Sequence, residues 1–169
     1  MDMYDELIRR ASEKVRAKWD EQGGLQPKTV RLALGNIEMI EDFFAPGEVE
    51  RIYLNFSDPW PKKKHWRRRL THPRFLEKYR QLLNENGEIH FKTDSRVLFE
   101  FSLNAFAAVG LQMSDISLSL HEGGINEAHV MTEYESKFVG QGMPIYRCEV
   151  MVGEAALQRY HERKMDMFK

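Results

Sequence analysis

Three polar side chains each follow an apolar run that predicts a β-strand. Asn36 follows LALG, Asp58 follows YLNFS, and Asp94 follows IHFKT. The carboxyl ends of parallel strands meet at one edge of a sheet, where the ligands of α/β proteins bind. We therefore expect the three side chains to line one crevice. The alternative is that Asp58 and Asp94 cap the turns or helices that follow them, as aspartate often does.

A block of positive charge comes soon after Asp58. Residues 59–76 contain seven cations and no acid, whereas the whole chain has a net charge of −1. The positive character is therefore local, and it indicates an anionic partner with a defined docking place. The alternative is a solvated loop. The cations are Lys62, Lys63, Lys64, Arg67, Arg68, Arg69 and Arg74.

Two prolines flank a tryptophan at the start of this block. Pro59 and Pro61 restrict the backbone on either side of Trp60, because the proline ring fixes φ. A rigid turn of this kind would present the indole ring for stacking on a nucleobase. The alternative is that the ring packs against the sheet.

The elements that must position these residues alternate between strands and helices. Strands are predicted over 29–35, 51–57, 87–93, 111–120 and 145–152, and helices over 3–20, 37–44, 71–84, 96–109, 131–138 and 153–167. This alternation predicts one α/β domain over residues 1–169, with a mostly parallel sheet and helices on both faces. Segment 51–57 is apolar enough for burial on both faces.

The composition argues against several classes of protein. No apolar run approaches the roughly 20 residues of a membrane span, and the charged N-terminal segment lacks a signal-peptide core. Cys148 is the single cysteine, which excludes an internal disulfide, fits a reducing cytoplasm and predicts a small buried thiol. The six histidines lack metal-ligand spacing, so we expect no metal.

The stretches SDPWPKKKHWRRRL, GEIHFKTD and MTEYESKF, in this order, resemble the bacterial tRNA (guanine-N7)-methyltransferase family. The resemblance covers the chain from residue 2 to about residue 152. It implies a Rossmann-like class I methyltransferase fold and S-adenosylmethionine as the methyl donor. It also implies tRNA as the partner, methylated at N7 of the variable-loop guanosine at position 46.

The resemblance assigns roles to individual residues. Asp58 corresponds to the catalytic, cofactor-proximal acid, and Asp2 and Asn36 correspond to further cofactor-binding positions. The substrate-binding positions are Lys62, Asp94, Thr132, Glu133, Tyr134 and Glu135. The RNA-contacting segment is Lys64, His65, Trp66, Arg67, Arg68 and Arg69. Thr132 and Glu135 also have the spacing of a helix capping box, which is compatible with substrate contact.

The resemblance is weakest at the start of the chain. The family implies a first strand with a Gly-rich cofactor turn, but Gly23-Gly24 follows a predicted helix. Without the family's first strands, segment 29–35 lacks a neighbour, so we expect the chain to be destabilised, to dimerise or to exchange strands. The alternative function is a catalytically impaired tRNA-binding fragment.

Overall fold

The computed structural model describes residues 4–21 and 30–167. The chain divides after Phe44 into two compact units, each of which is described by itself. Among the described residues, none of the helices is both long and apolar enough to cross a membrane. The single-domain prediction stays a prediction.

The first unit contains the helix α1 (Asp5–Glu21) and the 3₁₀ helix η1 (Ile37–Asp42). The sequence predicts both, the first from apolar residues that recur at helical spacing and the second as a short helix that ends before the Pro46-Gly47 turn. Ion pairs one turn apart support α1: Arg9 lies 3.2 Å from Glu6 and 2.8 Å from Glu13. Such exposed pairs each contribute only about 0.3–0.5 kcal/mol.

The strand predicted over 29–35 is wrong for the part that the structure describes. Residues 30–35 form only an isolated bridge at Leu34, and Val30, Leu32 and Leu34 are 40%, 41% and 50% exposed. A strand needs a neighbour for its backbone hydrogen bonds, and no ladder reaches this segment within the described residues. Dimerisation or strand exchange stays a prediction.

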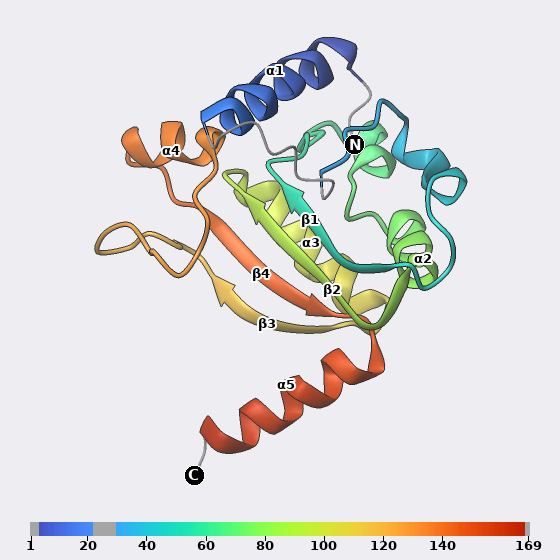
Figure 1. The fold of residues 1–169 in the computed structure, drawn as a ribbon. Coiled ribbons are helices and arrows are strands. Elements are labelled where there is room, and N and C mark those ends of the chain that lie inside the picture. The colour runs from blue at the N-terminus through green and yellow to red at the C-terminus, as the bar shows by residue number, and fades with distance from the viewer. Residues whose placement is uncertain (1–3, 22–29, 168–169) are drawn as a thin grey trace. The chain divides into compact units, whose positions relative to one another are not determined.

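The second unit is built on a four-stranded sheet in the order β1-β2-β4-β3 (Figure 1). The strands are β1 (Val49–Asn55), β2 (Leu83–Thr93), β3 (Gln112–Ser117) and β4 (Tyr146–Met151). β1 pairs with β2 in parallel, whereas β4 pairs antiparallel with both β2 and β3. The prediction of a mostly parallel sheet is confirmed only in part: β1, β2 and β3 share one direction, but only one of the pairings is parallel.

One face of this sheet is apolar and the other is polar. Ile89, Phe91, Cys148 and Val150 are buried on one face, and they alternate along β2 and β4 with His90, Lys92, Arg147 and Glu149. This alternation follows from the two-residue period of a strand. The charged residues of β2 and β4 therefore share the second face.

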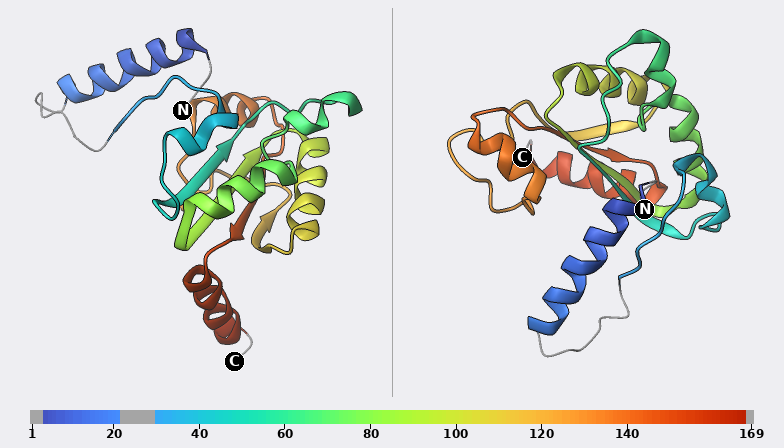
Figure 2. Two further views of the ribbon diagram at one scale, coloured as in Figure 1. Left: turned by 90° about the vertical axis from the view of Figure 1, so that its right-hand side faces the viewer. Right: turned by 90° about the horizontal axis from the view of Figure 1, so that it is seen from above.

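Helices α2 (Pro73–Leu82) and α3 (Arg96–Ala108) pack on the apolar face (Figure 2). The ring of Phe91 lies 6.0 Å from that of Phe99 and 6.2 Å from that of Phe106. The remaining helices, α4 (Glu133–Gly140) and α5 (Glu154–Met167), bond to residues of the polar face, since Glu135 pairs with Lys92 and Arg159 with Glu88. Helices therefore contact both faces, as predicted.

Two predicted details of this unit are wrong. β1 is not buried on both faces: it pairs only with β2 in the described sheet, and Tyr53 is 60% exposed. Thr71 does not cap α2, because His72 is the N-cap and its Nδ1 accepts from Arg74 N at 3.2 Å. Thr71 is buried instead and hydrogen-bonds with Ser102 Oγ at 2.7 Å.

Candidate functional site

Two of the three strand-end residues leave the same edge of the sheet. β1 and β2 run in parallel, with Asn55 opposite Lys92, and Phe56 N donates to Lys92 O at 2.9 Å. Asp58 follows β1 by three residues, and Asp94 directly follows β2. The shared strand direction therefore places both carboxylates at the carboxyl edge, as the sequence predicts.

The third predicted residue, Asn36, follows a segment that forms no strand in its described part, and it belongs to the other unit. Its Oδ1 accepts from Glu38 N at 3.0 Å, which caps η1 and leaves the amide nitrogen as a donor. Asp2, the other predicted cofactor residue, lies outside the described residues.

Neither strand-end aspartate caps a helix. The N-cap of α3 is Ser95, whose Oγ accepts from Leu98 N at 3.3 Å, and the N-cap position of η2 (Lys63–Arg68) is Lys62. Neither Asp58 nor Asp94 forms a hydrogen bond or ion pair with any other residue that the structure describes. Both carboxylates are therefore able to accept hydrogen bonds from a ligand.

The turn that carries Asp58 is conformationally strained. Phe56 has a φ of 53° and Trp60 a φ of 40°. Residues other than glycine rarely adopt such positive values, which cost about 1–3 kcal/mol each. The face of the Trp60 ring is covered by the Arg68 guanidinium at 4.9 Å, and His65 lies 5.7 Å away. In this arrangement the indole contacts η2, and stacking of the ring on a nucleobase stays a prediction.

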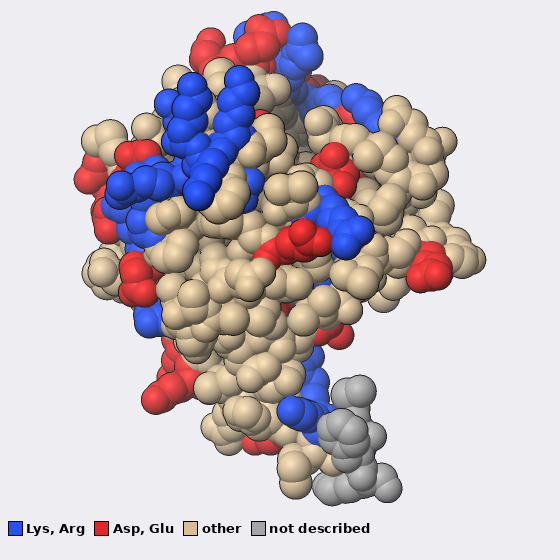
Figure 3. All heavy atoms as spheres, turned by 180° about the vertical axis from the view of Figure 1, so that it is seen from behind, with Lys and Arg blue, Asp and Glu red and all other residues tan. Residues whose placement is uncertain are grey.

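The positive block forms η2, and most of it is exposed. The exposed cations are Lys62, Lys63, Lys64, Arg67 and Arg68. Lys and Arg side chains gather on the face that Figure 3 shows. Desolvation and then the charges of Arg68 and Lys64 lower the pKa of His65, which stays neutral near pH 7.

Two other cations of the block bond to backbone carbonyls: Arg69, which is buried, and Arg74, which is half-buried. Arg69 is 0% exposed and donates from Nε to Pro59 O at 2.9 Å and from Nη2 to Trp60 O at 3.2 Å. Arg74 Nε donates to Arg67 O at 2.7 Å. Arg69 is therefore not available to a phosphate in this conformation, contrary to its predicted place in the RNA-contacting segment.

The TEYE segment forms the first turn of α4, and its capping box is confirmed. Thr132 Oγ1 accepts from Glu135 N, and Glu135 Oε2 accepts from Thr132 N, both at 3.1 Å. The Tyr134 ring lies 5.5 Å from that of Phe56. Tyr134 comes 76 positions after Asp58 in the chain (134 − 58). The fold nevertheless brings the TEYE segment beside the turn that carries Asp58.

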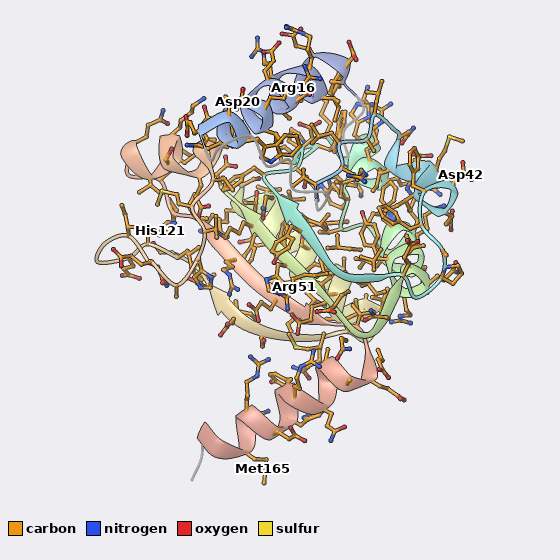
Figure 4. The ribbon with its side chains drawn as sticks, in the orientation of Figure 1. Arg16, Asp20, Asp42, Arg51, His121 and Met165 are labelled. Carbon is orange, nitrogen blue, oxygen red and sulfur yellow. The ribbon has the colours of Figure 1, made fainter. Side chains whose placement is uncertain are left out.

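Glu135 is a buried anchor rather than an exposed substrate group. Its carboxylate is 0% exposed and accepts from Lys92 Nζ at 3.1 Å, while His121 Nε2 lies 2.8 Å from Oε1. Burial raises the pKa of Glu135, but hydrogen bonds led by that from His121 outweigh burial and lower it. His121 lies in the segment between β3 and α4 (Figure 4).

Sequence reasoning missed Lys92 and His121. The available signal was Lys92 itself, a charged residue inside the strand-like stretch IHFKT, since an ionisable group in a central strand needs a partner. The identity of that partner required the fold, because Glu135 is 43 residues away.

A cavity of about 510 Å³ opens on the polar face of the sheet. Asn55, Lys92, Thr132 and Arg147 contribute to its lining, and its volume falls within the roughly 300–1,000 Å³ of small-ligand sites. A larger hollow contains none of the predicted site residues, and part of its charge is paired, with Arg51 (labelled in Figure 4) lying 3.1 Å from Glu88. The described residues contain no group of three or more His, Cys, Asp or Glu that could hold a metal ion.

Rossmann-like proteins are α/β sheets that bind their ligands outside the carboxyl ends of parallel strands. The second unit is an α/β sheet with such an edge at its parallel pair, β1 and β2. A family model described as "Putative methyltransferase" matches residues 1–148, and the chain belongs to that family.

Relatives named tRNA (guanine-N(7)-)-methyltransferase match most of the chain. The proteins of Bacillus licheniformis and Bacillus subtilis are 48% and 45% identical over 149 and 150 residues, which are 88% and 89% of this chain and 66% and 67% of those proteins. The protein of Geobacillus sp. is 55% identical over 121 residues, 72% of this chain and 54% of that protein. The chain thus spans about two thirds or about half of the length of these relatives.

A solved structure also shows a weak likeness. Geranyl diphosphate C-methyltransferase from Streptomyces coelicolor is 15% identical with a TM-score of 0.40, over 85% of this chain and 57% of that chain. A likeness at this level carries no argument about fold or ligand.

Proposed function

We propose that this chain transfers a methyl group from S-adenosylmethionine to N7 of a guanosine in tRNA. The observation that carries the proposal is that an acid and a basic helix lie next to each other in the chain. The Asp58 carboxylate has no partner among the described residues, and the exposed basic helix η2 begins five residues later at Lys63. The names of the relatives support this reaction. A tRNA partner and a single buried cysteine support a cytoplasmic location.

The chemistry requires positioning more than proton removal. Guanine N7 is an accepting lone pair on the major-groove edge and loses no proton on methylation. Most of the rate enhancement then comes from orienting the base for in-line attack. The Asp58 carboxylate is suited to accept from guanine N1–H and from the exocyclic amine, which selects guanine over adenine.

Asn36 and Asp58 carry hydrogen-bonding groups of the types that S-adenosylmethionine requires. When bound, S-adenosylmethionine supplies an electrophilic methyl group on a sulfonium. The amide nitrogen of Asn36 remains a donor suited to an adenine ring, because its oxygen is already used in capping η1. The carboxylate of Asp58 remains an acceptor for a hydroxyl or ammonium group.

The exposed cations of η2 would hold the tRNA backbone. Contacts to phosphates set affinity and register and carry no sequence information directly. Lys62, Asp94, Glu133 and Tyr134 are proposed to contact the substrate near the methylated base. Glu135 and Lys92 form a buried ion pair with each other, so we propose that they stabilise this region rather than contact the substrate.

Replacing Asp58 by asparagine tests the catalytic assignment. Transfer of labelled methyl from S-adenosylmethionine to tRNA should fall at least about tenfold, because one amide group cannot accept both guanine donors. Asp42→Asn is the matched control, since Asp42 is an exposed carboxylate in the first unit. Near-normal turnover of Asp58→Asn would refute the role of Asp58.

The cations of η2 can be tested separately from catalysis. Replacing Lys63, Lys64 and Arg68 together by methionine should reduce the slope of log K for tRNA against log salt by about 2–3, because each phosphate contact contributes about 0.7–0.9. An unchanged slope would remove η2 from the interface. Binding of tRNA without methyl transfer by the wild-type chain would favour the alternative, a catalytically impaired tRNA-binding fragment.

A further inference from the structure

Arg69 belongs to the basic block by sequence, but its side chain is used inside the protein. It is 0% exposed, whereas its neighbours Arg67 and Arg68 are exposed. Its guanidinium donates from Nε to Pro59 O at 2.9 Å and from Nη2 to Trp60 O at 3.2 Å. The two acceptors are the carbonyls that directly follow Asp58 in the chain.

These two carbonyls lie in the strained part of the turn. Trp60 has a φ of 40°, which a tryptophan holds only when its surroundings fix the backbone. Carbonyl groups near the interior also require a donor. The guanidinium supplies two donors in a rigid planar fork, so it fixes both peptide planes together.

The far side of the guanidinium is fixed by aromatic rings. Its central carbon lies 5.0 Å from the ring of Trp66 and 4.4 Å from the ring of Phe101. Phe101 is part of α3, the helix that begins at Arg96, two residues after Asp94. Arg69 therefore connects the turn after β1 to the helix after β2.

We propose that Arg69 is a positioning residue for the Asp58 carboxylate. Arg69 acts through the carbonyls of Pro59 and Trp60 and does not bind the tRNA backbone. The functional part of this proposal rests on the proposed methyl transfer. The structural part, that Arg69 holds the turn, does not depend on any activity.

The first measurement is amide hydrogen exchange of Phe56 and His65 in the full chain, because their N–H groups are hydrogen-bonded on the two sides of the turn. Arg69→Met removes both donors but keeps an apolar stem between the rings, and it should raise exchange at these two amides about tenfold by local opening. Arg67→Met removes an equal charge from an exposed position of η2 and should leave exchange unchanged. Arg69→Lys keeps the charge without the fork, and its exchange should lie between the wild type and Arg69→Met.

The second measurement is steady-state methylation of tRNA by the same variants. Arg69→Met should lower kcat about tenfold or more, because Asp58 loses its orientation, while Arg67→Met should mainly raise KM for tRNA. Arg69→Lys should recover part of the lost kcat. If Arg69→Met does not fold, Arg69→Lys carries both measurements, with smaller changes in the same direction.

Each outcome decides the proposal. Unchanged exchange in Arg69→Met would overturn it, and so would faster exchange accompanied only by the rise in KM seen for Arg67→Met. If the wild-type chain does not methylate tRNA, the proposed function fails, whereas the exchange measurement still shows whether Arg69 holds the turn.

Discussion

Lys92 connects β2 to α4 through one buried ammonium group. Its Nζ donates to Val130 O at 3.0 Å and to both carboxylate oxygens of Glu135 at 3.1 Å. The side chain of Lys92 is 10% exposed and that of Glu135 is 0% exposed. Lys92→Met would remove the charge and all three contacts while it keeps an apolar stem of similar length.

The expected cost follows from the carboxylate that is left behind. Removing one partner of a buried ion pair costs about 3–5 kcal/mol, because the other charge remains buried without compensation. Thr132 N and His121 still contact Glu135, so we expect the free energy of unfolding to fall by about 3 kcal/mol near pH 7. At about 2–4 °C per kcal/mol for a chain of this size, Tm falls by about 6–12 °C.

Thermal and urea unfolding followed by circular dichroism would measure this change. Lys137→Met is the matched control, because Lys137 is exposed on α4, and it should change stability by less than about 0.5 kcal/mol. A double-mutant cycle with Glu135→Gln should give a coupling energy of about 1–3 kcal/mol. A Lys92→Met variant as stable as the Lys137→Met control would refute the reasoning.

Three further outcomes follow from buried groups in the second unit. Because its folded pKa lies below 4.5, Glu135 contributes stability that is present above pH 4.5 and is lost as the pH falls through the folded pKa; acid unfolding of Glu135→Gln should therefore show a weaker pH dependence. Tyr79→Phe should raise the free energy of unfolding by up to about 1 kcal/mol, because the buried hydroxyl has no hydrogen-bond partner in the described part of the chain; a clear loss of stability in urea would contradict this. Burial raises the pKa of Cys148 to about 12, so iodoacetamide should leave the folded chain unmodified and alkylate it in urea; rapid labelling of the folded chain would contradict the burial.

Local patterns predicted the helices and the apolar core well. Phe75, Leu76, Tyr79 and Leu82 recur at helical spacing, and all four are buried in α2. The period of a helix is set by hydrogen bonds within a few residues, so a short stretch of sequence carries it. The strand-end placement of Asp58 and Asp94 was predictable for a related reason, since parallel strands share their carboxyl edge.

Strand pairing was less predictable, because it depends on residues far away in the chain. Segment 29–35 has the apolar pattern of a strand but forms only an isolated bridge at Leu34 in its described part. Segment 51–57 looks like a strand buried on both faces, yet β1 is an edge strand of the described sheet and Tyr53 is exposed. A strand pattern therefore predicts an apolar surface, but it does not identify the segment that covers this surface.

The sequence by itself determined the types of groups at the candidate site: an acid after a strand, a rigid proline turn, a local block of cations and a capping box. Only the tertiary structure decided which of them are exposed and which are used inside the protein. Arg69 turns inward because Phe101, which lies 32 positions later (101 − 69), offers an aromatic surface and the strained turn offers two carbonyls. Glu135 is buried because Lys92 and His121 reach it from distant segments. The orientation of a charged side chain depends on long-range partners that compensate its desolvation, and neighbouring residues in the sequence do not specify them.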